Sequence, residues 1–167
     1  MDKIKIKKSP VKSSIITFIL LIFSLIVVSG FSGCLREDNK QNLSQVDIQG
    51  RTGINSFRVD IADDFAEQTN GLMGRKILDN NEGMLFIFED EKIQGFWMKD
   101  TLIPLDMIFI SSNLTVIDIN KNSLPCKDGE PCRIYHSAYP AKYVLEINGG
   151  MSDNLDISTG DKVKISI

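Results

Sequence analysis

Short apolar runs separated by polar turns recur along the chain from residue 54 onward. The segment 57–61 alternates apolar and polar residues, as expected of a strand with one buried face. Residues 84–88 form a wholly apolar run, which is typical of a short buried strand. The same signals predict further strands at 96–98, 105–110, 115–119, 143–147 and 163–165. We therefore expect about seven short strands.

One helix is expected between the first two of these strands. Asp64 and Glu67 have the spacing of a capping box, and Phe65 and Leu72 fall on one helical face. A second, shorter helix is expected within 151–157. Many short strands with so little helix predict an α+β fold that is mostly β. The expected architecture is a small barrel or a strongly curved sheet.

The first 33 residues follow a different pattern. A lysine-rich start is followed by an apolar run at 15–28 and by small residues at 29–33. This order is typical of a secretory signal. Because Cys34 directly follows Ser32-Gly33, the segment resembles a lipobox, where the signal is cut and the new terminal cysteine is lipidated. We expect residues 1–33 to be removed and the lipid on Cys34 to anchor the protein at the outer, extracytoplasmic face of the membrane.

An uncleaved membrane anchor is the alternative for this segment. The apolar run at 15–28 is 14 residues long, whereas a spanning helix needs about 20. Phe31 also departs from the aliphatic residue usual three positions before a lipidated cysteine. A single acyl chain holds a protein only marginally, so firm anchoring needs a second chain or a basic patch. The lipoprotein interpretation is favoured, and the anchor stays open.

The remaining chain is expected to contain a tether and one domain. Residues 34–53 combine the lipidated cysteine with a polar, flexible tether, and 54–167 form the β-rich domain. Of the 19 basic and 22 acidic side chains, five lysines and Asp2 precede Cys34. Residues 34–167 therefore carry 14 basic and 21 acidic groups, a formal charge of −7. Such a surface disfavours binding to nucleic acid.

Two further cysteines, Cys126 and Cys132, are separated by five residues that include Pro131 and an Asp-Gly turn. In an oxidising compartment a pair this close is expected to form a disulfide. Closing so short a loop contributes on the order of 2–3 kcal/mol in the chain-entropy model. A redox pair or half of a metal site is the alternative, although the spacing matches neither motif.

Five motifs occur in order along the predicted domain. They are GLMGR at 71–75, GMLFIF at 83–88, FWMKDTLIPLD at 96–106, VLE at 144–146 and GDKV at 160–163. Together they resemble the DUF192 family, also called UPF0127, over residues 57–167. The family is a domain of unknown function that is commonly exported, so the resemblance implies a fold and a location but no activity.

One position departs from the family pattern. This chain has Asp100 where the family usually carries Asn. If this position binds a ligand, the added negative charge alters which ligand is taken.

Two acidic residues stand among apolar neighbours. Asp106 shares its strand face with Ile108, and Glu146 lies in the apolar strand 143–147. Because an unpaired buried charge costs several kcal/mol, each carboxylate is expected to be paired or hydrogen-bonded. The cations available in the motifs are Arg75 and Lys99, so we expect a partly buried network of all four side chains. Its role in fixing loops to the sheet is favoured over a role in lining a cleft.

Other candidate residues carry weaker signals. Trp97 is the only tryptophan, and core packing is favoured over an exposed ring that stacks on a sugar or a peptide side chain. His136 is the only histidine, and no nucleophile elbow surrounds it, so no catalytic residue is assigned. No metal-ligand cluster or phosphate-binding loop is recognisable, so no metal or cofactor is expected. Asn42 and Asn113 fit the N-glycosylation tripeptide, a weak signal because so short a pattern arises by chance.

The sequence favours a binding or envelope accessory module over an enzyme. The partner would be a small polar ligand or an envelope protein, and a hydrolase acting on envelope material through two paired carboxylates is one alternative. A purely structural partner domain, with an exposed apolar patch and no cleft, is the other. The candidate ligand-binding residues are Arg75, Trp97, Lys99, Asp100, Asp106 and Glu146. The last two are also the carboxylate pair of the hydrolase alternative.

Overall fold

The computed structural model describes residues 44–127 and 129–167. The predicted signal, the predicted lipidation site Cys34, and Asn42 lie outside these residues. The elements in chain order are β1 Gln45–Gln49, β2 Ile54–Ala62, α2 Phe65–Asn70, β3 Glu82–Lys92, β4 Gly95–Trp97, β5 Leu105–Ile110, β6 Val116–Ser123, β7 Ile134–His136, β8 Ala141–Asn148, α3 Met151–Asn154 and β9 Lys162–Ser166. No helix among the described residues is both long and apolar enough to cross a membrane.

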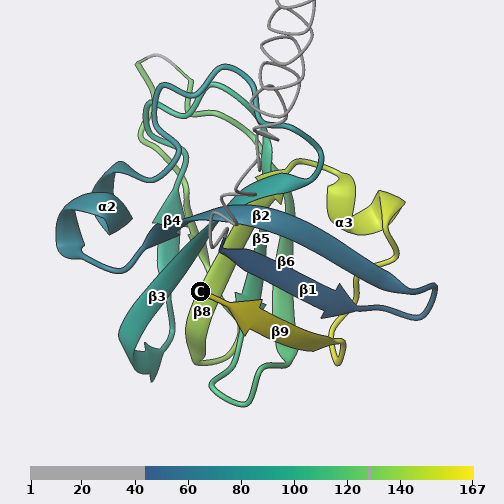
Figure 1. Ribbon diagram of the computed structural model, residues 1–167. Helices are drawn as coiled ribbons and strands as arrows, with labels where there is room; N and C mark the ends of the chain where they lie inside the picture. Colours follow the sequence, from purple (N-terminus) through teal and green to yellow (C-terminus); the bar gives the residue numbers. More distant parts are fainter. Residues whose placement is uncertain (1–43, 128) are drawn as a thin grey trace, which may run out of the picture. The chain divides into compact units, whose positions relative to one another are not determined.

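Seven strands form one strongly curled sheet in the order β6-β5-β8-β3-β2-β1-β9. The β2–β3 pair is parallel, and the other pairs of this sheet are antiparallel. A bridge between Thr115 and Lys162 joins the start of β9 to the residue before β6, so the two edges of the sheet approach one another. Figure 1 shows β1 and β9 crossing in front of β5 and β8 as the sheet curls. The predicted mostly-β fold with a curved sheet is confirmed.

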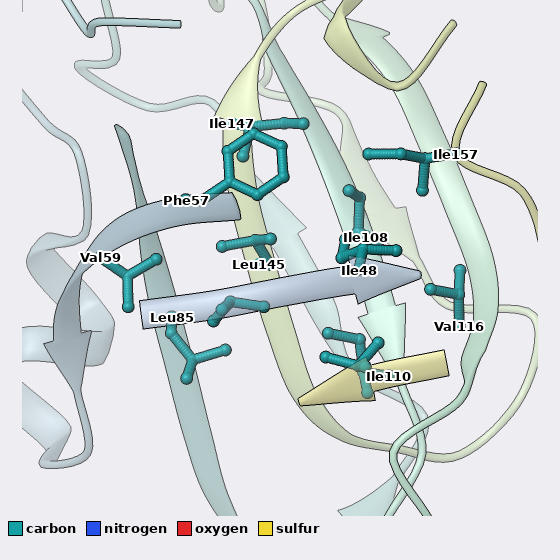
Figure 2. Close-up of a cluster of buried hydrophobic side chains, with 12 residues drawn as sticks. Ile48, Phe57, Val59, Leu85, Ile108, Ile110, Val116, Leu145, Ile147 and Ile157 are labelled. Atoms are coloured by element: carbon teal, nitrogen blue, oxygen red, sulfur yellow. The ribbon is translucent and has the colours of Figure 1, made fainter. Parts of the chain in front are cut away.

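The two faces of the sheet bury two separate apolar clusters. Ile108 and Leu145 belong to the cluster inside the curl, which Figure 2 shows, together with side chains from β1, β2 and β3. Their chain neighbours Met107 and Val144 belong to the cluster on the opposite face. Successive side chains of a strand point to opposite faces, so β5 and β8 contribute to both clusters. This explains why all six residues of β5 are buried.

The outer cluster is covered by a small two-stranded sheet made of β4 and β7. Phe96 of β4 inserts its ring among the aromatic side chains of the large sheet. Its centroid lies 4.9 Å from that of Phe86 and 6.1 Å from that of Phe109, and both pairs are edge-to-face. Such pairs add about 0.5–1.5 kcal/mol beyond the burial of their area.

The domain begins earlier than the sequence predicts. Strand β1 lies within the stretch expected to be a flexible tether, and it pairs with both β2 and β9. Val46 and Ile48 are fully buried in the inner cluster. Only these two apolar residues mark the strand, and their burial depends on β2 and β9, which lie far apart in the chain. The tether prediction is therefore wrong for the residues of β1.

Helix α2 begins as predicted and ends sooner. The Asp64 side chain accepts a hydrogen bond from the Glu67 backbone N–H, and the Glu67 side chain accepts one from the Asp64 N–H, which confirms the capping box. Gly71 takes a φ of 44°, which ends the helix after Asn70. Phe65 remains 86% exposed. The expected apolar face of this helix is therefore wrong.

Candidate functional site

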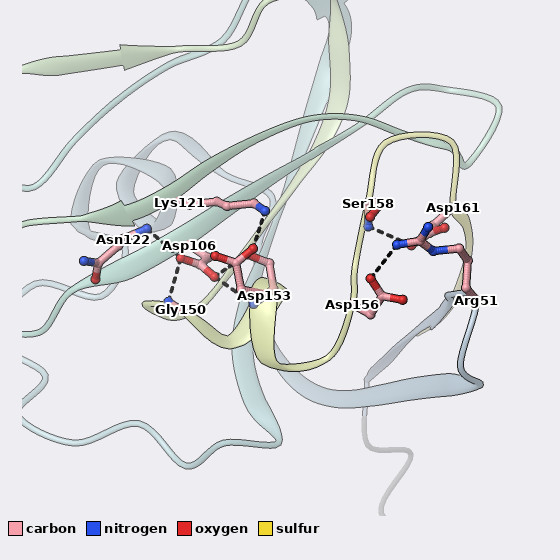
Figure 3. Close-up of polar contacts among 10 residues, drawn as sticks. Arg51, Asp106, Lys121, Asn122, Gly150, Asp153, Asp156, Ser158 and Asp161 are labelled. Atoms are coloured by element: carbon pink, nitrogen blue, oxygen red, sulfur yellow. Dashed lines mark hydrogen bonds and ion pairs between the residues drawn. The ribbon is translucent and has the colours of Figure 1, made fainter.

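Asp106 is fully buried and is satisfied entirely by hydrogen bonds. Its carboxylate accepts from the backbone N–H groups of Asn122 at 2.7 Å, Gly150 at 2.9 Å and Ser152 at 2.8 Å, and also from the Ser152 hydroxyl. Figure 3 shows Asp106 between the end of β6 and the turn that begins α3. Asp106 therefore fixes these two segments to β5, as the architectural interpretation predicts.

The predicted network of four charged side chains is not formed. Arg75 pairs with Asp60 at 2.6 Å near the surface, and the Lys99 Nζ lies 5.5 Å from the centroid of the Trp97 ring. Asp106 has no cation partner among the described residues, because backbone N–H groups supply its donors. The network hypothesis is wrong because the motif residues sit on different elements and faces.

The sheet register also separates the two carboxylates. In the β5–β8 pairing, Asp106 is opposite Ile147 and Met107 is opposite Glu146. Because directly opposed residues share a face and neighbouring residues alternate, Asp106 and Glu146 point to opposite faces of the sheet. They do not form the carboxylate pair that the hydrolase alternative needs.

Glu146 lies in the outer face of the sheet with a carboxyl group that no described side chain or backbone group binds. Its residue is 4% exposed, and burial raises the pKa of its carboxyl to about 8. Met84 of β3 and Met107 of β5 are its register partners. Desolvation by these apolar neighbours disfavours the charged form, so the carboxyl is largely protonated at neutral pH.

The Glu146 side chain lines a small opening, here called the Glu146 pocket, with a volume of about 30 Å³. Its wall combines the end of α2, the loop after it, aromatic side chains of β3 and β4, and one threonine. The lining residues are Gln68, Thr69, Asn70, Gly71, Leu72, Met73, Phe86, Phe96, Trp97, Thr101 and Glu146. Four of the five sequence motifs that resemble the family contribute residues to this wall.

Trp97 stands on the outer side of β4 and is 45% exposed. Its neighbours Phe96 and Met98 pack into the outer cluster, so the predicted core packing of Trp97 is wrong and its ring faces solvent beside the pocket. Across the small sheet it is opposite Ile134, which is also exposed. These two side chains form an exposed apolar surface on the small sheet, of which Trp97 also lines the pocket.

Asp100 is exposed and does not line the Glu146 pocket. Its φ is 53°, and its carbonyl accepts the Gly74 N–H at 2.8 Å. Asn and Asp are the non-glycine residues that tolerate this left-handed conformation best. The turn therefore explains why Asp can stand where the family usually has Asn.

Arg75 lies in a separate and larger pocket of about 310 Å³. Its ion pair with Asp60 faces a second pair, Arg58 with Glu82 at 3.0 Å. Each arginine already has a carboxylate partner, so this pocket offers no free charge to a ligand. Among the residues that the structure describes, no cluster of three His, Cys, Asp or Glu side chains could hold a metal ion.

Four polar residues of the Glu146 pocket were missed by the sequence analysis. Gln68, Thr69 and Asn70 come from α2, and Thr101 comes from the turn after β4. Single polar residues in a short helix or a turn carry no periodic signal, although Thr101 lies inside the FWMKDTLIPLD motif. For Thr101 its position in that motif was the available indication, and the α2 residues had none.

The cysteine pair and the remaining surface residues lie away from the Glu146 pocket. Cys126 and Cys132 have their Cα atoms 5.2 Å apart, a separation that suits the expected disulfide. His136 and Asn113 are both exposed, which agrees with a surface position for each.

Comparison with known proteins gives a consistent picture. The model of the DUF192 family, described as "Uncharacterized ACR", matches residues 45–165. A UPF0127 protein of Pyrococcus abyssi is 34% identical over 64% of this chain and 85% of its own, and one of Pyrococcus horikoshii is 32% identical over the same shares.

Two crystal structures resemble the domain. One, a protein of unknown function from Novosphingobium aromaticivorans, has a TM-score of 0.67 and 39% identity, and the match covers 72% of this chain and 83% of that one. The other, from Sinorhizobium meliloti and described as a candidate transcription regulator, has a TM-score of 0.68 and 34% identity over 73% and 92% of the two chains. The chain therefore belongs to the DUF192, or UPF0127, family.

Proposed function

We propose that this protein is a binding module, held at the outer face of the membrane by lipid on Cys34, that takes a polar end group of an extracytoplasmic ligand into the Glu146 pocket. The observation that carries the proposal is a buried carboxyl group that has no partner in the described protein and that lines an opening to solvent.

A comparison of the two buried acids supports a binding role for Glu146. Asp106 receives hydrogen bonds from three backbone N–H groups and one hydroxyl, so its burial serves the fold. Glu146 receives none from the described residues, and the burial that raises the pKa of its carboxyl to about 8 disfavours its charged form at neutral pH. A group that destabilises the fold at an accessible position is typical of a functional site.

The surroundings of the pocket support a ligand with an apolar stem. Trp97 is exposed and lines the pocket, Ile134 is exposed opposite it on the small sheet, and an amphipathic tryptophan ring suits contact with a chain that carries a polar end. The signal-like start and Cys34 support an extracytoplasmic location. The hydrolase alternative has less support because Asp106 and Glu146 lie on opposite faces of the sheet. The structural partner alternative has less support because the domain has a pocket as well as an exposed apolar surface.

Trp97 provides the test, since it is the only tryptophan and lines the pocket. The full chain, purified in detergent, is titrated with short peptides and small polar compounds while its tryptophan fluorescence is recorded. The proposal expects compounds that shift the emission of the native protein and of Glu82→Gln, a glutamate variant outside the pocket, but not that of Glu146→Gln. Equal responses from Glu146→Gln, or no response to any compound, would overturn it.

A further inference from the structure

We infer that the group received by the Glu146 pocket is a primary ammonium, such as the end of a lysine side chain, held between the Glu146 carboxylate and the aromatic wall. This inference rests on the proposed function and names the chemistry of its ligand. Three properties of the pocket support this inference: its charge, its volume and the aromatic residues in its wall.

The charge of the pocket excludes an anionic ligand. Among the described residues that line it, Glu146 is the only acidic or basic side chain, and none of them is a lysine, arginine or histidine. A ligand carboxylate or phosphate would find no cationic side chain to pair with in this wall, and it would lie beside the Glu146 carboxyl group. An ammonium would donate a hydrogen bond to the ionised Glu146 carboxylate, which carries the opposite charge. Hydrogen bonds between charged groups are about twice as strong as neutral ones.

The size of the pocket restricts the ligand to a small end group. A cavity needs roughly 10–15 Å³ to hold one water molecule, and this pocket has about 30 Å³. A primary ammonium is close to a water molecule in size. A guanidinium, a trimethylammonium or a sugar ring is several times larger and cannot enter.

The aromatic wall adds attraction for a cation. Phe86, Phe96 and Trp97 line the pocket, and cations gain from aromatic faces within about 6 Å of the ring centroid. The chain itself shows this preference, because the Lys99 Nζ lies 5.5 Å from the Trp97 centroid. Lys99 is exposed and does not line the pocket, so the pocket itself stays open to a ligand ammonium.

Binding is coupled to the release of one proton. Glu146 begins as a neutral carboxyl, and an entering ammonium favours the carboxylate, so the carboxyl proton passes to solvent while the ligand keeps its own charge. The facing groups on the neighbouring strands are Met84 and Met107, which do not titrate. A single titrating group therefore controls the pH dependence, and Kd is expected to fall about 50-fold from pH 6 to pH 8.

The test uses three probes that share one alkyl chain and differ only at the end group: n-butylammonium, n-butanol and n-butyrate. Each is titrated into the full-length protein between pH 6 and pH 8 with Trp97 fluorescence as the readout. Carbon-13 labelling of glutamate side chains reports the ionisation of Glu146 in the same samples. We expect binding of n-butylammonium alone, a Kd that falls with rising pH, and a carbon-13 shift that marks a new carboxylate.

Variants make the result specific to the pocket. Glu146→Gln is expected to lose both n-butylammonium binding and its pH dependence, whereas Glu82→Gln retains them. Butyltrimethylammonium, which carries the same charge on a larger head, is expected not to bind. Nα-acetyl-lysine amide and alanine amide then separate a lysine side chain from a terminal amine, and we expect the lysine derivative to bind more tightly.

The possible failures are distinguishable. Binding of n-butanol or n-butyrate that equals or exceeds that of n-butylammonium, and that Glu146→Gln alters, would overturn the ammonium inference and leave the binding module intact. Absence of binding by all three probes and by the peptides of the wider titration would overturn both. Binding of n-butylammonium without a pH dependence would also overturn the inference, because Glu146 would then not be the partner.

Discussion

Replacing Glu146 with Gln should stabilise the protein increasingly as the pH rises. Gln has nearly the same shape and cannot ionise, so the substitution removes the titration and leaves the packing against Met84 and Met107 in place. An amide at this buried position also costs free energy when it lacks a partner, but that cost does not change with pH. The informative quantity is therefore the pH dependence of the difference between the two proteins.

The magnitude follows from the pKa of Glu146, which burial raises from 4.5 to about 8. Below pH 4.5 the carboxyl is protonated in both the folded and the unfolded state, so its contribution to stability is fully present. Between these two values the unfolded chain binds fewer protons than the folded one, and the free energy of unfolding falls by about 1.4 kcal/mol per pH unit. The total loss by pH 8 is on the order of 5 kcal/mol, a large share of the ~5–15 kcal/mol typical of a domain.

Urea denaturation of both proteins at several pH values between 4 and 8.5, followed by Trp97 fluorescence, measures this difference. We expect the free energy of unfolding of Glu146→Gln minus that of the native protein to be smallest near pH 4 and to rise steadily toward pH 8. A difference that stays constant over this range would refute the reasoning, because it would mean that Glu146 has the same pKa in the folded and unfolded states. Glu82→Gln serves as the control and should show little pH dependence near pH 8.

Other substitutions test the remaining assignments. Asp106→Asn should destabilise the domain by about 2–4 kcal/mol, because its new amide N–H₂ opposes backbone donors; a change below 0.5 kcal/mol in urea denaturation would contradict the architectural role. Arg75→Ala should cost less than about 1 kcal/mol, since its ion pair with Asp60 is partly exposed; a loss of several kcal/mol would show otherwise. Cys34→Ser should abolish the lipid mass increment and release the protein from membranes, and unchanged fractionation would favour an uncleaved anchor. Reduction of the Cys126 disulfide should lower stability by about 2–3 kcal/mol, and an unaltered urea midpoint would argue against that bond.

Local signals in the sequence were sufficient for most of the secondary structure. Alternation and apolar runs predict β2, β3, β5, β6, β8 and β9, because a strand that covers a core must present apolar residues at the proper period. The capping box at Asp64 and Glu67 predicts the start of α2, since it depends only on residues three positions apart. The fold class follows from these elements.

Long-range pairing decided the elements that the sequence did not reveal. Strand β1 has only two apolar residues, and its place depends on strands at both ends of the domain. Strand β7 is three residues long and pairs with β4 across the long segment between them. Such short strands carry too little pattern of their own, so their hydrogen-bonding partners define them.

The sequence by itself determined that Asp106 and Glu146 are acids placed in apolar strands, and that each would need an explanation. Only the tertiary structure decided what each explanation is. The register of β5 against β8 sends the two side chains to opposite faces, where Asp106 accepts hydrogen bonds from the backbone of two turns and Glu146 lines a pocket in which no described group donates to it. A shift of one residue in that register would exchange the faces, because the side-chain period of a strand is two. The chemistry of the site therefore depends on strand pairing, which no local pattern in the chain specifies.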